Sequence, residues 1–411
     1  MKRALFGCQF TGIVAVSALF AQSAAAQSQT PQSSSYTVTD LGLASEATPA
    51  QPLFIANNGL IADAVAAGSV WHAVLWFQGM QLDLTKAGGL GGPNSTAFGV
   101  NEKGQAVGFG ETADFDPAQE DFCTFGTSRV CQAFVWQNGV MSALPPLKDA
   151  FNIAGRNTIA NAINNLGQVV GTAENTTLDS TCPPYDPSSL QYQKYQFKPV
   201  MWANGKIQEL PTPGGDPDGF VLGINERGEA VGATGTCAGL QLDGTYLYGH
   251  HATLWQNGSV IDLGNLGGVA PGFGNWAYKI NKWGHVVGTS GTRDGSFHAF
   301  FWSPETLIQD LGTLPGDAAS AGLAINEIGD VTGISLSASG QLRAFIRPDG
   351  GAMTDLNALV PANTTNLYLF TACSINSRGE IIGMAFDPQG NVHGYLATPS
   401  GSAAQASVLE R

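Results

Sequence analysis

The sequence has little charge, and few of its charges are positive. Charged residues make up 12% of the 411 positions, with 18 Lys and Arg against 32 Asp and Glu, so the formal net charge is −14. A coiled coil or long-helix protein would be rich in Glu and Lys. A surface with this acidic balance repels phosphate backbones, so we expect no nucleic-acid partner. The hydrophobic fraction of 43% is too high for a disordered chain.

Long apolar runs are also scarce, and the one candidate lies at the N-terminus. A positively charged start precedes an apolar stretch over 4–20, and an A-x-A cleavage pattern ends at Ala26. The stretch contains polar residues and is short for a membrane span. We therefore expect a signal peptide over 1–26, a polar linker over 27–35, no membrane span and a secreted or periplasmic location.

Cysteines are few, and none has the C-x-x-C spacing of a zinc site, so we expect neither a metal nor a cofactor. Five follow the signal, at Cys123, Cys131, Cys182, Cys237 and Cys373. In an exported protein such residues form disulfides, and an odd number leaves a free thiol or an intermolecular bond. We prefer the pairs Cys123–Cys131 and Cys182–Cys237, with other pairings open, and expect Cys373 to be a buried thiol.

Glycine, by contrast, is abundant at 53 residues, and much of it follows an internal repeat. A segment built around N-x-x-G recurs at 97–108, 160–171, 221–232, 277–288, 322–333 and 372–383, with a divergent copy at 54–64. N-x-x-G is typical of a type I turn, in which Asn accepts backbone hydrogen bonds. Each copy therefore predicts two short strands, A and B. The strand A residue two before the Asn is small in five copies, which suits a crowded central axis.

A second motif, close to H-A-F-x-W, follows each copy of the first. It occupies 72–76, 132–136, 198–202, 251–255, 298–302, 343–347 and 393–397. In three units it leads into Asn-Gly, the strongest short signal for a hairpin. The motif therefore predicts a second hairpin of strands C and D, so that each unit is one four-stranded propeller blade.

The two ends of the repeat array complement each other. Residues 37–42 read as a strand D without a preceding A, B or C, and 393–399 read as a strand C without a following D. The first segment can complete the last blade, which closes a ring and removes exposed sheet edges. We predict an all-β, seven-bladed β-propeller of four-stranded antiparallel blades over 36–399, with a tail over 400–411, in preference to a solenoid or paired β-domains.

These motifs resemble the HAF-repeat family of predicted extracellular bacterial proteins, named for the triplet that stands here at 298–300. The resemblance covers nearly all of 36–398. It implies an extracellular repeat protein and brings no assigned activity with it. Three units depart from the pattern, because Asp63 replaces the strand B glycine and Arg347 and Ala397 replace the Trp.

Three consecutive units carry long insertions between strands B and C, at about 110–131, 173–197 and 235–250. These loops share the rim opposite the tight turns, and loops on a rigid scaffold commonly hold binding groups. The first insertion contains Asp114, Asp116, Glu120 and Asp121. Because their spacing is not that of a calcium loop, we favour a solvated acidic loop over calcium binding or acid–base use.

Aromatic and basic residues are the candidate binding groups. The third unit's insertion offers residues that could stack on sugars or pack the loops together: Tyr185, Tyr192, Lys194 and Tyr195. Three more lie on or near inner strands and could line the mouth of a central channel: Arg156, Trp276 and Lys279. Lys279 replaces one of the small residues.

Histidines recur at one position in four units, so they cannot converge on one site, and we expect a structural role for His72, His251, His298 and His393. His250, with Tyr246 and Tyr248 close in sequence, is the best acid–base candidate. No nucleophile elbow, phosphate loop or metal-binding His cluster occurs, so we assign no catalytic residue.

We therefore expect an exported, monomeric propeller scaffold, rather than an enzyme, that binds a glycan or a protein on the long-loop face of units two to four. The alternative is a carbohydrate-active enzyme, such as a polysaccharide lyase, with His250 and Tyr246 or Tyr248 as its acid–base pair. That alternative rests on analogy between folds.

Overall fold

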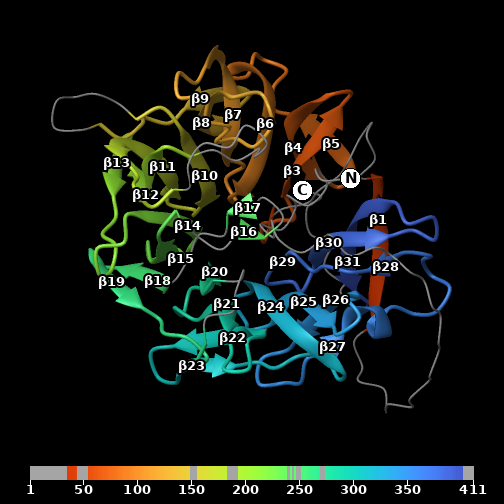
Figure 1. The fold of residues 1–411 in the computed structure, drawn as a ribbon. Helices are drawn as coiled ribbons and strands as arrows, with labels where there is room; N and C mark the ends of the chain where they lie inside the picture. Colours follow the sequence, from red (N-terminus) through yellow and green to blue (C-terminus); the bar gives the residue numbers. More distant parts are fainter. Residues whose placement is uncertain are drawn as a thin grey trace.

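The computed structural model describes residues 35–43, 54–148, 155–182, 193–237, 241–242, 245–246, 251–268 and 274–400. These residues form seven antiparallel blades arranged in a ring (Figure 1). The predicted seven-bladed β-propeller is confirmed. Within the described ranges, no helix is long and apolar enough to cross a membrane.

The first four blades follow the predicted A–B–C–D order. Blade one contains β2 (Phe54–Ile55), β3 (Ile61–Ala67), β4 (Val70–Phe77) and β5 (Met80–Asp83). Blade two contains β6 (Gly91–Val100), β7 (Ala106–Phe115), β8 (Arg129–Gln137) and β9 (Val140–Ala143). Blade three contains β10 (Thr158–Ile163), β11 (Val169–Leu178), β12 (Tyr195–Ala203) and β13 (Lys206–Glu209). Blade four contains β14 (Asp218–Ile224), β15 (Ala230–Gly235), β18 (His251–Gln256) and β19 (Ser259–Asp262).

The remaining blades close the ring. Blade five contains β20 (Trp276–Ile280), β21 (Val286–Gly291), β22 (Phe297–Ser303) and β23 (Leu307–Asp310). Blade six contains β24 (Asp317–Ile325), β25 (Val331–Ser337), β26 (Leu342–Arg347) and β27 (Thr354–Asp355), followed by the 3₁₀ helix η2 (Leu356–Leu359). Blade seven contains β28 (Tyr368–Leu369), β29 (Ser374–Ile375), β30 (Ile381–Phe386), β31 (Val392–Pro399) and β1 (Tyr36–Leu43). The insertion of blade four adds a small hairpin of β16 (Gln241–Leu242) and β17 (Thr245–Tyr246).

Ring closure uses the first strand of the described chain, as the sequence predicts. β1 pairs antiparallel with β31, from Tyr36 opposite Pro399 to Leu43 opposite His393 (Figure 1). The hydrophobic core is divided into clusters between neighbouring sheets. One cluster joins Leu75 of blade one to Phe134 of blade two, for example. Each blade therefore buries its faces against its two neighbours, which a closed ring supplies to all seven.

The Asn of each N-x-x-G turn has two structural roles. In blade two, Asn101 Oδ1 accepts the backbone N–H groups of Lys103 and Gln105 at 3.1 and 3.0 Å, which fixes the turn. Its Nδ2 donates to the carbonyl of Asn164, the equivalent residue of blade three, at 3.0 Å. The same donation to the next blade is made by Asn164, Asn225, Asn281, Asn326 and Asn376. A ring of side-chain hydrogen bonds thus ties the blades together at the tight-turn rim.

The strand B glycine is required by the strand beside it. A Cβ on Gly232 would lie 1.8 Å from the carbonyl oxygen of Phe220 in β14, a distance that no side chain tolerates. The equivalent glycines face a strand A carbonyl in the same way, at 1.8 to 2.1 Å. Blade one differs, because its strand A is reduced to β2, and Asp63 takes the place of the glycine. Asp63 Oδ2 there accepts the indole N–H of Trp76 at 2.8 Å.

The repeated histidines are structural, as expected. Each Nδ1 lies 2.8 to 3.0 Å from an Asp carboxylate of strand D, in the pairs His72–Asp83, His251–Asp262, His298–Asp310 and His393–Asp40. The last pair joins β31 to β1, so the closing contact repeats the one inside the other blades. In blade six, Arg343 replaces the His and still reaches Asp355, with Nη1 3.5 Å from Oδ2.

Candidate functional site

The described parts of the insertions of blades two, three and four lie on the rim opposite the Asn ring. They follow β7, β11 and β15 and comprise 116–128, 179–182 with 193–194, and 236–237 with β16 and β17. Both preferred disulfides are present in this region, Cys123–Cys131 within the first loop and Cys182–Cys237 between the second and third. Cys373 is buried at 4% exposure, as expected, but it is disulfide-bonded, so its prediction as a free thiol is wrong.

The acidic residues of the first insertion do not form a solvated loop. Asp116, Glu120 and Asp121 are 4%, 0% and 8% exposed, and only Asp114 is on the surface. The loop folds inward because Asp116 makes the turn that follows β7, where its Oδ1 accepts the N–H of Ala118 at 2.7 Å. This turn carries Glu120 toward blade three, and the prediction of a solvated acidic loop is therefore wrong.

A third carboxylate from blade three meets two of these acids. Glu174, in β11, is 1% exposed, and Asp116, Glu120 and Glu174 each offer an oxygen within 4.8 Å of the others. We call these three residues the acid cluster. Burial, followed by the charge of Glu120, raises the pKa of Glu174 to about 9. Burial also raises the pKa of Glu120. Three adjacent buried carboxylates cannot all stay charged without a bound cation. In the absence of a cation, at least one of them holds a proton.

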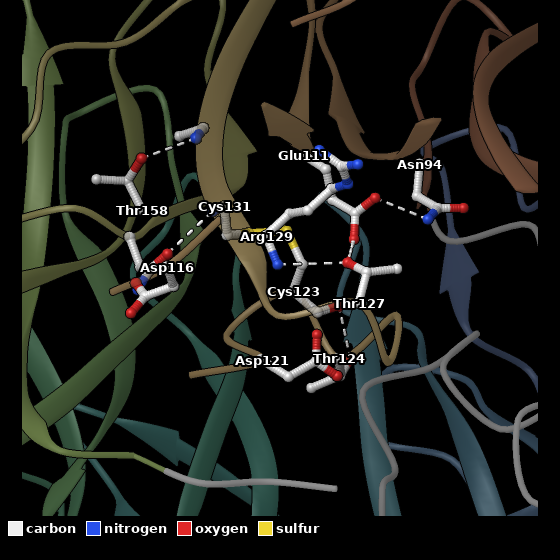
Figure 2. Close-up of a disulfide and its surroundings, with 12 residues drawn as sticks. Asn94, Glu111, Asp116, Asp121, Cys123, Thr124, Thr127, Arg129, Cys131 and Thr158 are labelled. Carbon is white, nitrogen blue, oxygen red and sulfur yellow. Dashed lines mark hydrogen bonds between the residues drawn. A yellow bond between two sulfur atoms is a disulfide. The ribbon is translucent and has the colours of Figure 1, made fainter. Parts of the chain in front are cut away.

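In blade two, the Glu at the same repeat position has both carboxylate oxygens hydrogen-bonded. Glu111 of β7 is the counterpart of Glu174 and is 1% exposed. Its Oε2 accepts Asn94 Nδ2 at 2.7 Å, and its Oε1 accepts the hydroxyl of Thr127. Figure 2 shows this network on one side of the Cys123–Cys131 disulfide, with Asp116 on the other side. A buried Glu at this position can therefore be satisfied by neutral hydrogen-bond donors alone. The cluster at Glu174 arises because the loop of blade two brings Asp116 and Glu120 beside it.

A second carboxyl pair lies at the next blade boundary. Asp218, at the start of β14, is 1% exposed and faces Asp179 from the second insertion. Burial, followed by a hydrogen bond with Asp179, raises the pKa of Asp218 to about 9. Asp218 Oδ1 accepts the N–H of Phe197 at 3.0 Å, whereas its Oδ2 is buried and accepts no N–H or hydroxyl group of the described residues. In the two preceding blades, the equivalent residue is an Asn.

Three of the predicted binding residues meet at the acid cluster, through their backbones. The N–H of Arg156 donates to Glu174 Oε2 at 3.3 Å. The N–H groups of Lys194 and Tyr195 donate to Glu120 Oε1 at 2.5 and 3.3 Å. The side chain of Arg156 is exposed, and Lys194 Nζ lies 5.6 Å from the ring centroid of Tyr195. The side chains are thus available to a ligand while their backbones hold the two acids.

Trp276 belongs to a chain of aromatic rings on the same side of the ring. It starts β20, at the end that faces the insertions, and packs 6.3 Å from Tyr278 and 6.2 Å from Phe220 between ring centroids. Phe220 in turn packs 4.8 Å from Phe197. Phe197 and Tyr278 are buried, whereas Phe220 and Trp276 are half-buried. The chain crosses blades three, four and five and leaves two aromatic side chains partly open to solvent.

Lys279 lies in the channel, as predicted, but nearer the opposite rim. It lines a cavity of about 120 Å³ at the Asn-ring mouth, which is also lined by Glu102, Glu226 and Glu327. Lys279 Nζ sits 5.0 Å from the ring centroid of Phe54 in blade one. Burial lowers the pKa of Lys279 to about 8. The two large residues occupy the strand A position that is small in the other five blades, so they fill the axis together.

The remaining predicted residues lie outside the part that the structure describes. Tyr185, Tyr192, Tyr248 and His250 fall there, as do the signal peptide over 1–26 and the tail beyond residue 400. Tyr246 belongs to β17, but its side chain is not described. The acid–base pair of the lyase hypothesis thus stays a prediction.

Sequence reasoning missed the roles of Glu174, Asp218 and Phe220. For Glu174, the alignment of the repeats held a signal, because Glu111 and Glu174 both follow the strand B glycine by three residues. For Asp218, the signal was its alignment with Asn94 and Asn157. Neither alignment shows which loop residue would approach, because the insertions have no repeat partner.

No family model matches the chain, and no curated protein matches it. Among solved structures, it is similar to an acylaminoacyl peptidase from Pyrococcus horikoshii, with 10% identity, a TM-score of 0.49, and 88% of this chain and 51% of that chain covered. The chain thus spans about half the length of that peptidase.

Two further similarities are to chains nearer this one in length. The β-propeller domain of the Trilobed protease from Pyrococcus furiosus has 14% identity and a TM-score of 0.42, with 75% and 81% of the two chains covered. The BP39L lectin from Burkholderia pseudomallei has 12% identity and a TM-score of 0.37, with 89% and 96% covered.

Proposed function

We propose that this protein is an exported β-propeller of the HAF-repeat type that binds a glycan on the face formed by the insertions of blades two to four and the adjoining end of blade five. The observation that carries the proposal is the half-buried pair Phe220 and Trp276, held in place by the buried rings of Phe197 and Tyr278. Rigid aromatic faces that are partly open to solvent suit the apolar face of a sugar ring.

Polar groups for the sugar hydroxyls lie on the same rim. Arg156 has an exposed side chain, and Lys194 and Tyr195 have half-buried ones. The backbone N–H groups of all three residues are held by hydrogen bonds to the acid cluster. A rigid backbone beneath adaptable polar side chains lowers the entropy lost on binding. A protein partner would use the same aromatic and basic residues and is the competing occupant of this face.

The test is a glycan array probed with the purified protein, followed by titration of the best glycan. We expect Trp276→Ala and Phe220→Ala to weaken binding by about tenfold or more, because each removes a stacking surface. The matched control is Trp283→Ala, which removes an exposed Trp (58%) from the tight-turn rim and should leave the affinity unchanged. Absence of binding to every glycan, or equal loss in the control, contradicts the proposal.

A further inference from the structure

The acid cluster joins blade two to blade three. Asp116 and Glu120 come from the loop after β7, and Glu174 comes from β11. All three are at least 96% buried, and among the described residues none of them forms an ion pair with Lys, Arg or His. The cluster therefore carries up to three negative charges in a low-dielectric environment, which only a proton or a cation can balance.

The hydrogen-bond donors around the cluster are neutral amides, and they leave one oxygen unsatisfied. Glu174 accepts Asn157 Nδ2 and Gln193 Nε2 at 3.2 and 3.4 Å, and Asp116 Oδ2 accepts the same Asn157 Nδ2 at 3.0 Å. Glu120 Oε1 is occupied by two backbone N–H groups. Glu120 Oε2 is fully buried and accepts no N–H or hydroxyl group of the described residues, and the carboxyl group of Glu120 contacts that of Glu174. Because Oε1 of Glu120 accepts the backbone N–H groups of blade three, its Oε2 is the oxygen available to a ligand of the cluster.

The chemistry of the donor set selects the ligand. Three carboxylates within 4.8 Å of one another supply hard oxygen donors only, the type that calcium prefers. Neither His nor a free thiol belongs to the cluster, which argues against zinc. We propose that Asp116, Glu120 and Glu174 bind one calcium ion that fastens the insertion of blade two to blade three. The calcium ion holds Glu120, and through it the backbone of Lys194 and Tyr195, in place.

Blade two provides the internal comparison. Glu111 occupies the same repeat position as Glu174, is equally buried at 1% exposure, and has its two oxygens satisfied by Asn94 and Thr127. No second carboxylate is placed beside it among the groups of acids that could hold a metal in the described part of the chain. A calcium site therefore belongs to the boundary of blades two and three and not to every blade.

The proposal does not rest on glycan binding, and its test uses no glycan. The whole protein is stripped with a chelator, and its melting temperature is then measured with and without millimolar calcium, alongside a calorimetric titration with calcium chloride. We expect one calcium ion per chain and a rise of about 5 °C in the melting temperature. E174Q and E120Q should abolish both effects, whereas E111Q should keep them.

Both kinds of variant should fold, because Gln keeps the shape of Glu and relieves the repulsion between the acids when calcium is absent. A higher melting temperature of E174Q than of the chelated wild type would support this account. The proposal is overturned if the wild type shows no response to calcium, which is the result expected of a shared proton alone. It is also overturned if E174Q or E120Q still binds calcium, or if E111Q loses binding to the same extent.

Discussion

The two rims of the propeller treat their buried polar groups in opposite ways. At the tight-turn rim, six Asn side chains each satisfy a turn and donate to the next blade, so six of the seven blades repeat the same set of hydrogen bonds. At the insertion rim, carboxylates from blades two, three and four are buried against one another, and Glu120 and Asp218 each keep one buried oxygen that accepts no N–H or hydroxyl group of the described residues. The repeated turns therefore satisfy their buried polar groups with one another, whereas the insertions bury carboxylates side by side.

The largest effect on stability should come from removing one member of the Asn ring. Asn225 is 4% exposed, its Oδ1 accepts two backbone N–H groups, and its Nδ2 donates to Asn281. We expect Asn225→Ala to lower the free energy of unfolding by about 3 kcal/mol, because it leaves buried backbone groups unsatisfied. A urea titration measures the loss. A loss below about 1 kcal/mol would show that the ring adds little to the stability of the blades.

At the insertion rim, by contrast, removing a buried carboxylate should raise the free energy of unfolding. The pKa of Asp218 is about 9 in the folded state and near 3.8 in the unfolded state, so the folded protein holds a proton that the unfolded chain releases. With respect to this group, the free energy of unfolding is highest below pH 3.8, where both states hold the proton. It falls as the pH rises toward about 9, because the unfolded chain releases the proton and the folded protein keeps it. Asp218→Asn removes the dependence and should stabilise the protein by about 2 kcal/mol at pH 8.

The geometry of the preceding blade supports the Asp218→Asn substitution. Asn157 occupies the equivalent position, where its Oδ1 accepts the N–H of Cys131 at 2.9 Å, and Asn at 218 can accept the N–H of Phe197 in the same way. Melting curves from pH 5 to pH 9 test the prediction. Parallel curves for the two proteins would rule out Asp218 as the source of the pH dependence.

The third and smallest effect should come from completing the Asn ring. Blade one has Ala56 where the others have Asn, and its neighbours have taken over both roles. Asn58 Oδ1 accepts the N–H of Leu60 in the turn, and Asn57 Nδ2 donates to Glu102 of blade two. We therefore expect Ala56→Asn to change the free energy of unfolding by less than about 0.5 kcal/mol. A gain of 2 kcal/mol or more in the urea titration would contradict this redundancy.

Most of the fold could be predicted from the sequence because each blade is specified locally. N-x-x-G sets the A–B turn, Asn-Gly sets the C–D hairpin, and the unmatched segments at 37–42 and 393–399 indicate how the ring closes. The preferred disulfides followed from the loops in which the cysteines lie. HAF-repeat membership, the signal peptide and the exported location stay predictions.

The acid cluster could not be predicted in the same way. Asp116 and Glu174 lie in different blades, and a loop that folds inward looks the same in sequence as one that projects into water. The predicted solvated loop is instead folded inward, and two of its carboxylates are buried beside Glu174. The contact between Lys279 and Phe54 is also tertiary, because it joins blades five and one across the axis.

By itself, the sequence determined the number of blades, the turns that shape them and the strand that closes the ring, because these depend on contacts between near neighbours that recur in every unit. Only the tertiary structure decided which ionisable side chains are buried away from water. That outcome depends on how three unrelated insertions pack against one another, and no repeat constrains them. The candidate calcium site and the half-buried rings of Phe220 and Trp276 both belong to this second part of the molecule.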